Sequence, residues 1–232
     1  MIEGLPLYVP LIFLVTTLVT IWFLLAAAST SVRDSLPYKL LAFAIPLWLL
    51  ATGLLATTGF YREISMPPRV FVFGVLPSFL VIVGFFIFFR EGFISKLSLK
   101  HLTLLHTIRI PVELILLWLF FAGQVPRIMT FEGWNFDILS GITAPIVYFF
   151  AFRRSGVNRR LLIVWNVIAL GLLTNIVSIA VLSFQGPMQR LAFDQPNIGV
   201  TYLPFIWLPA IIVPIVLFSH LASLWQLLFR QR

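Results

Sequence analysis

One apolar stretch of the sequence carries the side chains with the most chemistry. Residues 102–122 read LTLLHTIRIPVELILLWLFFA, a run long enough to cross a lipid bilayer as a helix, yet it contains His106, Arg109 and Glu113. Their spacing of three and four residues places all three along one stripe of a helix. A charged side chain at the centre of a bilayer costs about 2.5–3.5 kcal/mol, so such residues usually face a bundle interior or a water-filled cavity. The stripe is therefore the first candidate for a functional site.

Two residues from other apolar runs are expected to join the stripe. His220 lies in the last run at a depth similar to that of His106, so the two imidazoles can meet and share a metal ion, a haem iron or a proton. Asn166 and Asn175 are nine residues apart and lie on opposite faces of a helix, so at most one reaches the same cavity. We place Asn175 there. The predicted ligand-binding set is His106, Arg109, Glu113, Asn175 and His220.

A structural interpretation of the stripe competes with the functional one. Arg109 and Glu113 are four residues apart and can pair along their own helix, and a buried pair of this kind can be purely architectural. Pro111 lies between them and has no N–H for the carbonyl of Thr107. We therefore expect a kink or another partner for that carbonyl.

The segments TFEGWNFD and FDQPN form a second candidate site, because their carboxylates and aromatic side chains could receive a polar or cationic solute at an outer mouth. The outer-mouth candidates are Glu132, Trp134, Asn135, Asp137 and Asp194. The alternative is that Trp134 belongs to an interfacial aromatic belt and that Asp137 caps the following helix.

The composition places the chain in a membrane. Of its 232 residues, 60% are hydrophobic and 10% are charged, against about 45–50% and 25% in an ordinary soluble domain. The mean hydropathy is +1.04. The net charge of +8 comes from basic residues in short loops between apolar runs, which indicates topology signals rather than a nucleic-acid-binding surface. Without cysteine, disulfides and thiol chemistry are excluded.

The apolar runs predict an all-α integral membrane protein with seven transmembrane helices in a single domain spanning residues 1–232. The predicted spans are residues 7–28, 39–59, 70–89, 102–122, 137–152, 161–183 and 202–228. The first, third and fifth loops and the C-terminal tail contain eleven Lys and Arg residues, and the other loops contain four. The eleven include Arg154, Arg230 and Arg232. This bias predicts an outside N-terminus and a cytoplasmic C-terminus.

Several classes of protein are excluded or disfavoured by missing motifs. The sequence has no phosphate-binding loop, dinucleotide fingerprint, HExxH or GxSxG motif. The last run has no lysine for a retinal Schiff base. The three histidines do not follow the pattern of seven-span zinc hydrolases, and the sequence names no cofactor. We therefore expect a protein that is not an enzyme.

The strings LLHTIRIPVE, MTFEGWNFDILSGITAP, AFDQPN and VPIVLFSHL resemble a family of bacterial seven-span membrane proteins of unassigned function. The resemblance implies seven spans and the cytoplasmic membrane of a bacterium, but no activity or cofactor.

From the residues we predict a protein that binds or passes a small polar or anionic solute, in a proton-linked manner, through an intramembrane polar cavity. Its partners would be the lipid bilayer and that solute, and oligomerisation stays open. Two alternatives remain. One is a haem- or metal-binding membrane protein with His106 and His220 as ligands, and the other is a sensor or assembly subunit whose polar stripe binds a partner helix.

Overall fold

The structure is a computed structural model that describes residues 2–153 and 156–229. Over these residues the regular structure is helical, apart from an isolated bridge between Phe184 and Asn197. The long helical elements are α1 (Tyr8–Val32), α2 (Leu36–Thr57), α3 (Leu76–Phe88), α4 (Leu99–Leu105), α5 (Arg109–Phe121), α6 (Ile138–Phe152), α7 (Arg159–Leu182) and α8 (Val213–Phe229). Single turns of tighter or wider helix complete the fold: η1 (Phe60–Arg62), η2 (Phe71–Val75), η3 (Ile94–Lys96), η4 (His106–Ile108), η5 (Arg127–Met129), η6 (Gly199–Thr201) and η7 (Leu208–Ile212).

The described residues contain six helical stretches that are long and apolar enough to cross a membrane. They are Tyr8–Ala28, Leu36–Thr57, Phe71–Phe88, Leu99–Phe121, Arg159–Leu182 and Leu208–Phe229. The predicted span at 137–152 corresponds to α6, which has 15 residues. At 1.5 Å per residue this helix is about 22 Å long, shorter than the hydrocarbon core of a bilayer, which is about 30 Å thick.

The last predicted helix starts later than the sequence indicated. We expected it to begin at residue 202, but the regular helical structure begins with η7 at Leu208. Tyr202 is extended, with φ −96° and ψ 148°, and the residue before Pro204 is kept out of the helical region by the proline ring. Pro209 lies in the first turn of η7, where its missing N–H is not needed.

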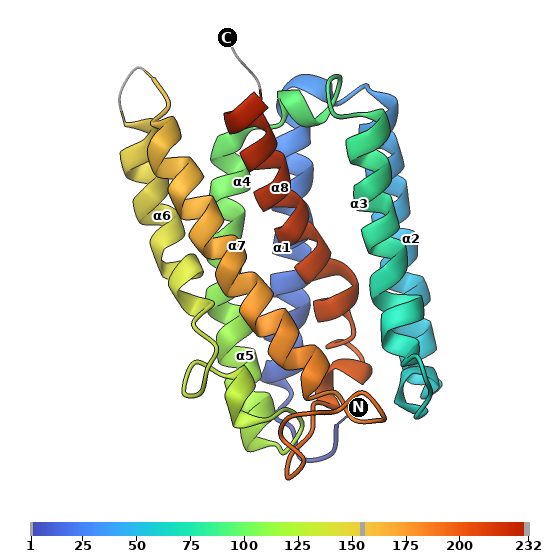
Figure 1. The fold of residues 1–232 in the computed structure, drawn as a ribbon. Coiled ribbons are helices and arrows are strands. Elements are labelled where there is room, and N and C mark those ends of the chain that lie inside the picture. The colour runs from blue at the N-terminus through green and yellow to red at the C-terminus, as the bar shows by residue number, and fades with distance from the viewer. Residues whose placement is uncertain (1, 154–155, 230–232) are drawn as a thin grey trace.

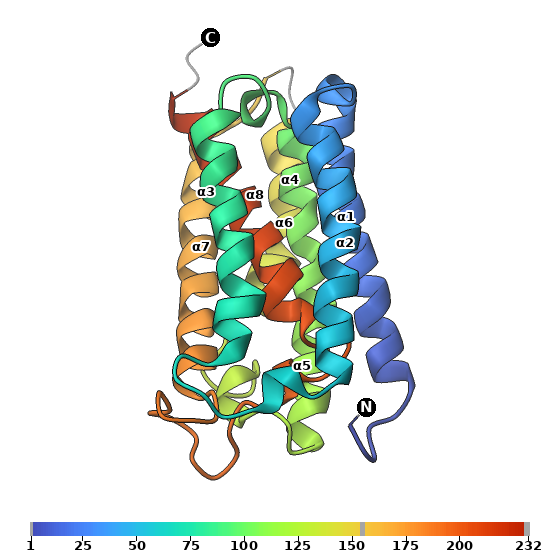
Figure 2. The same ribbon diagram turned by 90° about the vertical axis from the view of Figure 1, so that its right-hand side faces the viewer.

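The helices are arranged as a bundle around α8 (Figures 1 and 2). In the apolar window of Leu208–Phe229, 67% of the residues are buried, against 22% for α2 and 17% for Phe71–Phe88. The hairpin of α2 and α3 therefore lies at the periphery and presents large apolar side chains outward; Phe43 is 72% exposed and Phe88 is 76% exposed. Lipid is the environment that suits such a surface.

Hydrogen bonds attach this peripheral hairpin to the bundle: Nε1 of Trp207 donates to the carbonyl of Leu49 in α2 at 3.1 Å, and two more bonds meet at one carbonyl. The carbonyl of Ala210 accepts hydrogen bonds from Nε1 of Trp48 in α2 at 3.3 Å and from Oγ of Ser78 in α3 at 2.7 Å. In a regular helix this carbonyl would accept from the residue four positions later, but that residue is Pro214, which has no N–H. The proline therefore leaves a polar group inside the bilayer that the hairpin satisfies.

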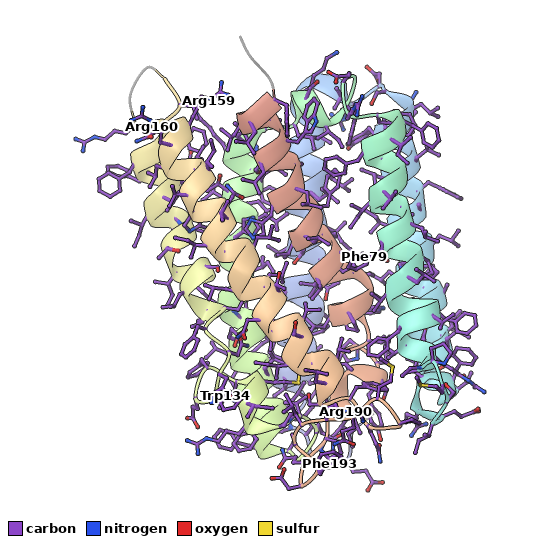
Figure 3. All side chains as sticks on the ribbon, in the orientation of Figure 1. Phe79, Trp134, Arg159, Arg160, Arg190 and Phe193 are labelled. Atoms are coloured by element: carbon purple, nitrogen blue, oxygen red, sulfur yellow. The ribbon has the colours of Figure 1, made fainter. Side chains whose placement is uncertain are left out.

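The two ends of the bundle both carry arginine side chains. α1 begins at one end and α8 ends at the other (Figure 1). Arg159 and Arg160 lie at the end where α8 finishes, whereas Arg190 lies at the opposite end (Figure 3). Arg154, Arg230 and Arg232, which also contribute to the predicted orientation, fall outside the described residues.

The helix that carries the ionisable stripe is interrupted, as Pro111 led us to expect. One tighter turn, η4, separates α4 from α5. The hydroxyl of Thr107, a residue of that turn, donates to the carbonyl of Leu104. The change in helical winding falls directly before Arg109, so it sets the direction in which that side chain leaves the helix.

Gly141 brings α6 unusually close to α5. A Cβ atom at this position would lie 2.9 Å from Cγ1 of Ile110, 3.0 Å from its backbone nitrogen and 3.3 Å from Cβ of Arg109. Asp137 lies one turn before Gly141 and is thereby held beside Arg109. Because residue 141 has no side chain, α6 can approach α5 closely enough to place the carboxylate of Asp137 beside Arg109.

The close contact predicts opposite effects for two glycine substitutions. Gly141→Ala should lower the free energy of unfolding by about 1–3 kcal/mol, because the added methyl group overpacks the contact with Ile110. Gly171→Ala in α7 is the matched control. Its Cβ would meet nothing within 4 Å, so better helix propensity should leave stability equal or higher. Thermal unfolding in detergent measures both, and equal effects would contradict the proposed role of Gly141.

Candidate functional site

Arg109 is at the centre of a buried polar cluster. Its side chain is nearly inaccessible, and Nη1 donates to Oδ1 of Asp137 at 2.6 Å and to the carbonyl of Ala169 at 3.3 Å. The structural alternative, in which Arg109 pairs with Glu113 along the same helix, differs from the ion pair found, which Arg109 makes with Asp137. The turn before Arg109 and the close approach of α6 at Gly141 favour a partner from another element over the one at i+4.

Glu113 is held instead by Asn135. Both carboxylate oxygens lie 2.7 Å from Nδ2 of Asn135, which also donates to the carbonyl of Met129 at 2.9 Å. Oδ1 of Asn135 accepts from the backbone N–H of Asp137 at 3.0 Å. Asn135 therefore connects the two carboxylate residues and fixes the segment that carries Asp137.

In residues 134–137, which precede α6, exposed and buried side chains alternate. Trp134 and Phe136 are 63% and 52% exposed, whereas Asn135 and Asp137 are buried. Figure 3 shows Trp134 at the periphery of the bundle. Irregular backbone at membrane depth occurs where it is covered by protein or lines a cavity. This alternation covers the backbone with aromatic rings outside and directs the polar groups inward.

The structure divides the predicted outer-mouth residues into two groups. Glu132, Trp134 and Asp194 are exposed, but Asn135 and Asp137 belong to the buried cluster. Asp137 occupies the N-cap position of α6, yet its side chain makes no capping hydrogen bond because it pairs with Arg109. Its carboxylate still lies at the positive end of that helix.

His220 is joined to the cluster through both ring nitrogens. Nδ1 lies 2.8 Å from Oδ1 of Asn166, whose Nδ2 donates to the carbonyl of Leu162, so the ring donates from Nδ1. Nε2 lies 2.9 Å from Nη2 of Arg109 and accepts from it. This network assigns a neutral imidazole with the proton on Nδ1.

His106 stacks on His220. The ring centroids are 3.9 Å apart with an interplanar angle of 20°, and Trp165 packs edge-on against His106 at 5.2 Å. Ser219 donates its hydroxyl proton to the carbonyl of Leu102 and therefore accepts from Nε2 of His106 at 3.3 Å. Nδ1 of His106 is buried without a hydrogen-bond partner. The predicted meeting of the two imidazoles is thus present in the structure.

The stacked arrangement does not fit a metal or haem iron shared by the two histidines. The donor lone pairs of an imidazole lie in the ring plane, and two nearly parallel planes do not direct them to one point between the rings. Both nitrogens of His220 are already engaged by Asn166 and Arg109. Among the described residues, no three His, Cys, Asp or Glu side chains form a group that could hold a metal ion.

Asn175 lies outside the cluster, contrary to the prediction. It is exposed and donates to the carbonyl of Trp134 at 2.8 Å, so it supports the entering segment from outside. Asn166, on the opposite face of α7, is the residue that reaches His220. The buried positions of α7, among them Leu162, Asn166 and Leu173, recur at helical spacing. This stripe was the signal that could have identified Asn166.

A cavity of about 130 Å³ borders the cluster. Arg109, Glu113, Asp137 and Asn197 contribute to a wall that is otherwise apolar, with most of its residues in η2, α5, α7, η7 and α8. Two of these polar residues each have a buried atom without a hydrogen-bond partner: Nε of Arg109, a donor, and Oδ1 of Asn197, an acceptor. The wall therefore combines an apolar surface with unused polar groups.

A second cavity, of about 280 Å³, lies between α2, α3 and α8. No residue in its wall is ionisable, and its polar side chains, Ser78 and Trp48, already bond to Ala210. The smaller cavity is therefore the better candidate for polar chemistry.

The fold and the site define a class: an all-helical integral membrane protein with a buried cluster of ionisable side chains. Residues 67–228 match a family described as Domain of unknown function (DUF8737), and the chain belongs to that family. The matched segment contains every residue of the cluster. No curated protein and no solved structure matches the chain.

The buried ion pair predicts strong coupling between its partners. Asp137→Asn should destabilise the protein by about 3–5 kcal/mol, because it leaves the guanidinium uncompensated. Arg109→Gln should cost a similar amount, and the double variant should cost clearly less than the sum of the two. The free energy of unfolding in mixed micelles measures all three.

The peripheral ion pair of Arg69 and Glu63 provides the control. These side chains are 30% and 61% exposed, so Glu63→Gln should change stability by less than about 1 kcal/mol. Additive effects of Arg109→Gln and Asp137→Asn would show that the buried pair does not act as a unit.

Proposed function

We propose that the protein binds or passes a small polar or anionic solute, in a proton-linked manner, at the cluster of Arg109, Glu113 and Asp137. The observation that carries this proposal is that one cation and two carboxylates share the wall of a cavity inside an apolar bundle. Such residues are costly in a membrane and usually mark solute or proton paths. The hydroxyl of Ser219 lies beside His106, but it donates its proton to the carbonyl of Leu102 and accepts from the ring, so it is not activated as a nucleophile, and the proposal is a non-enzymatic one.

The charges of the cluster are the reason for the proton linkage. Arg109 balances one ionised carboxylate, and one proton on the other leaves the cluster neutral. A bound anion adds a negative charge that the apolar surroundings do not stabilise. Its binding would therefore require a further proton, for which Glu113, Asp137 and the imidazole of His106 are the available acceptors.

Two other functions receive less support. The stacked rings of His106 and His220 argue against a shared haem or metal ion. A sensor or assembly subunit would use its polar stripe to bind a partner helix, but Arg109, Glu113 and Asp137 are all buried against residues of their own chain.

The proposed topology is seven crossings of a bacterial cytoplasmic membrane, with the N-terminus outside. It is supported by the opposite positions of the start of α1 and the end of α8, and by the arginines at the end where α8 finishes (Figures 1 and 3). α6 would be the short seventh crossing, continued outward by the segment that carries Trp134.

The topology predicts which cysteine substitutions react from outside. The chain has no native cysteine, so single substitutions can be labelled without background. A membrane-impermeant maleimide should label Phe193→Cys in intact bacterial cells and Val157→Cys only after permeabilisation. Both native residues are exposed, at 72% and 40%. Labelling of Val157→Cys in intact cells would reject the proposed orientation.

The proposed function predicts that specific solutes stabilise the protein through the cluster. The unfolding temperature of the purified protein is measured with a panel of carboxylates, phosphate esters, amino acids and sugar alcohols. At a concentration about 100 times its Kd, a bound solute adds about 2.7 kcal/mol of stability. A solute that raises the unfolding temperature of the wild type should have no effect on Arg109→Lys or Glu113→Gln.

Glu63→Gln is again the control, because it removes a carboxylate outside the cluster and should leave the solute effect intact. A panel without any stabilising compound, or equal stabilisation of all variants, would refute the proposed site.

A further inference from the structure

The cavity beside the cluster is bounded by helices that face the lipid. Its wall includes Phe79 of α3, Val177 of α7 and Val213 of α8. Phe79 is 36% exposed, and the helical stretch that carries it is the least buried of the six long ones. Figure 1 shows α3 and α7 on either side of α8, and Figure 3 places Phe79 on the side of α3 that faces α8. The natural approach to the cavity is therefore from the bilayer.

The wall of the cavity is mostly apolar. A fully hydrophilic solute would lose its water over this surface without gaining hydrogen bonds, at a cost of several kcal/mol for each unpaired polar group. A largely apolar molecule does not pay this desolvation cost when it enters the cavity. The chemistry of the wall therefore favours a solute with one small polar group attached to an apolar body.

The size of the cavity limits what it encloses. An apolar cavity of about 150 Å³ in another protein holds one benzene molecule, and this cavity measures about 130 Å³. It can take a head group and the first carbons of a chain. The rest of a longer molecule would extend between α3 and α7 into the lipid.

The polar groups of the wall beside Arg109 indicate the nature of the head group. The unpaired Nε–H of Arg109 can donate to a ligand oxygen, and the carboxylates of Glu113 and Asp137 in the same wall can accept from a ligand hydroxyl. The charge of Arg109 is already balanced by Asp137 at 2.6 Å, and Glu113 is close by. An uncharged hydroxyl meets both kinds of group without adding a charge to the cluster.

Resting on the proposed function, we infer that the solute is a single-chain amphiphile with an uncharged hydroxyl head group, and that it reaches the cluster sideways from the bilayer between α3 and α7. The inference depends on the lipid-facing walls of the cavity, their apolar lining and the unpaired Nε–H of Arg109 beside two carboxylates. It keeps the site and replaces the anion by an uncharged solute, whose binding by itself requires no further proton.

The test uses a long-chain primary alcohol with a photoreactive diazirine in its chain. The intact protein is reconstituted in phosphatidylcholine vesicles, irradiated with this probe and mapped by peptide mass spectrometry. Labelling is expected on the segments of α3 and α7 that line the cavity, and unlabelled dodecanol should compete for it. Dodecyl phosphate, which has the same chain and a charged head, should compete about tenfold less well, because the cluster has no free charge to pair with it.

Cavity-filling variants separate this site from general lipid partitioning. Val177→Trp on α7 and, from another wall, Val213→Phe should each reduce the competable labelling about tenfold, because their larger side chains occupy the cavity. Val167→Trp is the control: the native residue lies on the same helix as Val177 and is 56% exposed, and it does not line the cavity. If one of the two variants fails to fold, the other still tests the site.

Three results would overturn the inference. Equal labelling of Val177→Trp, Val213→Phe and Val167→Trp would mean that the probe only partitions into lipid around the protein. Stronger competition by dodecyl phosphate would assign a charged head group. Equal competition by a short water-soluble diol would assign access from water. If labelling fails while a polar solute still stabilises the protein through Arg109, the amphiphile is rejected and the proposed function stands; if both fail, both are rejected.

Discussion

The ion pair between Arg109 and Asp137 is the constraint around which the rest of this structure is organised. A guanidinium buried inside an apolar bundle needs a nearby carboxylate and hydrogen-bond acceptors for its remaining protons. Asp137, the Ala169 carbonyl and His220 meet most of this requirement, and each comes from a different part of the chain. α5, α6, α7 and α8 are thus held together by one side chain. Apolar packing alone does not specify partners in this way, because lipid tails compete equally for apolar surface.

The short α6 follows from the same constraint. A full-length helix would carry residue 137 away from the level of Arg109 or would start outside the bilayer. The chain instead enters as an irregular segment in which Asn135 and Asp137 are buried, and the helix begins at the residue after Asp137. Gly141 then permits the close helix contact. The backbone of this irregular segment is hydrogen-bonded by the side chains of Asn135 and Asn175.

The sequence predicted the helical architecture well, because the length and hydropathy of the apolar runs depend only on local composition. It also identified His106, Arg109, Glu113 and His220 as buried polar residues. It failed where the answer depended on tertiary geometry. Spacing along one helix allowed Glu113 as a partner of Arg109, but the partner found lies 28 residues away. Asn135 and Asp137 were assigned to a surface loop because nothing in their immediate neighbourhood indicates how deeply that loop enters. The choice between Asn166 and Asn175 required knowing which face of α7 meets α8.

Pro214 has a consequence for how the peripheral hairpin finds its place. In a bilayer, the apolar faces of α2 and α3 can pack against lipid as favourably as against protein. Apolar packing alone therefore does little to fix how these two helices are oriented against the bundle. The carbonyl of Ala210, which Pro214 leaves without a backbone donor, is more specific. Trp48 and Ser78 both donate hydrogen bonds to it, which fixes α2 and α3 relative to α8 at this point. A residue known for disrupting helices thus provides one acceptor that α2 and α3 share, and this contact favours one orientation of both helices against α8.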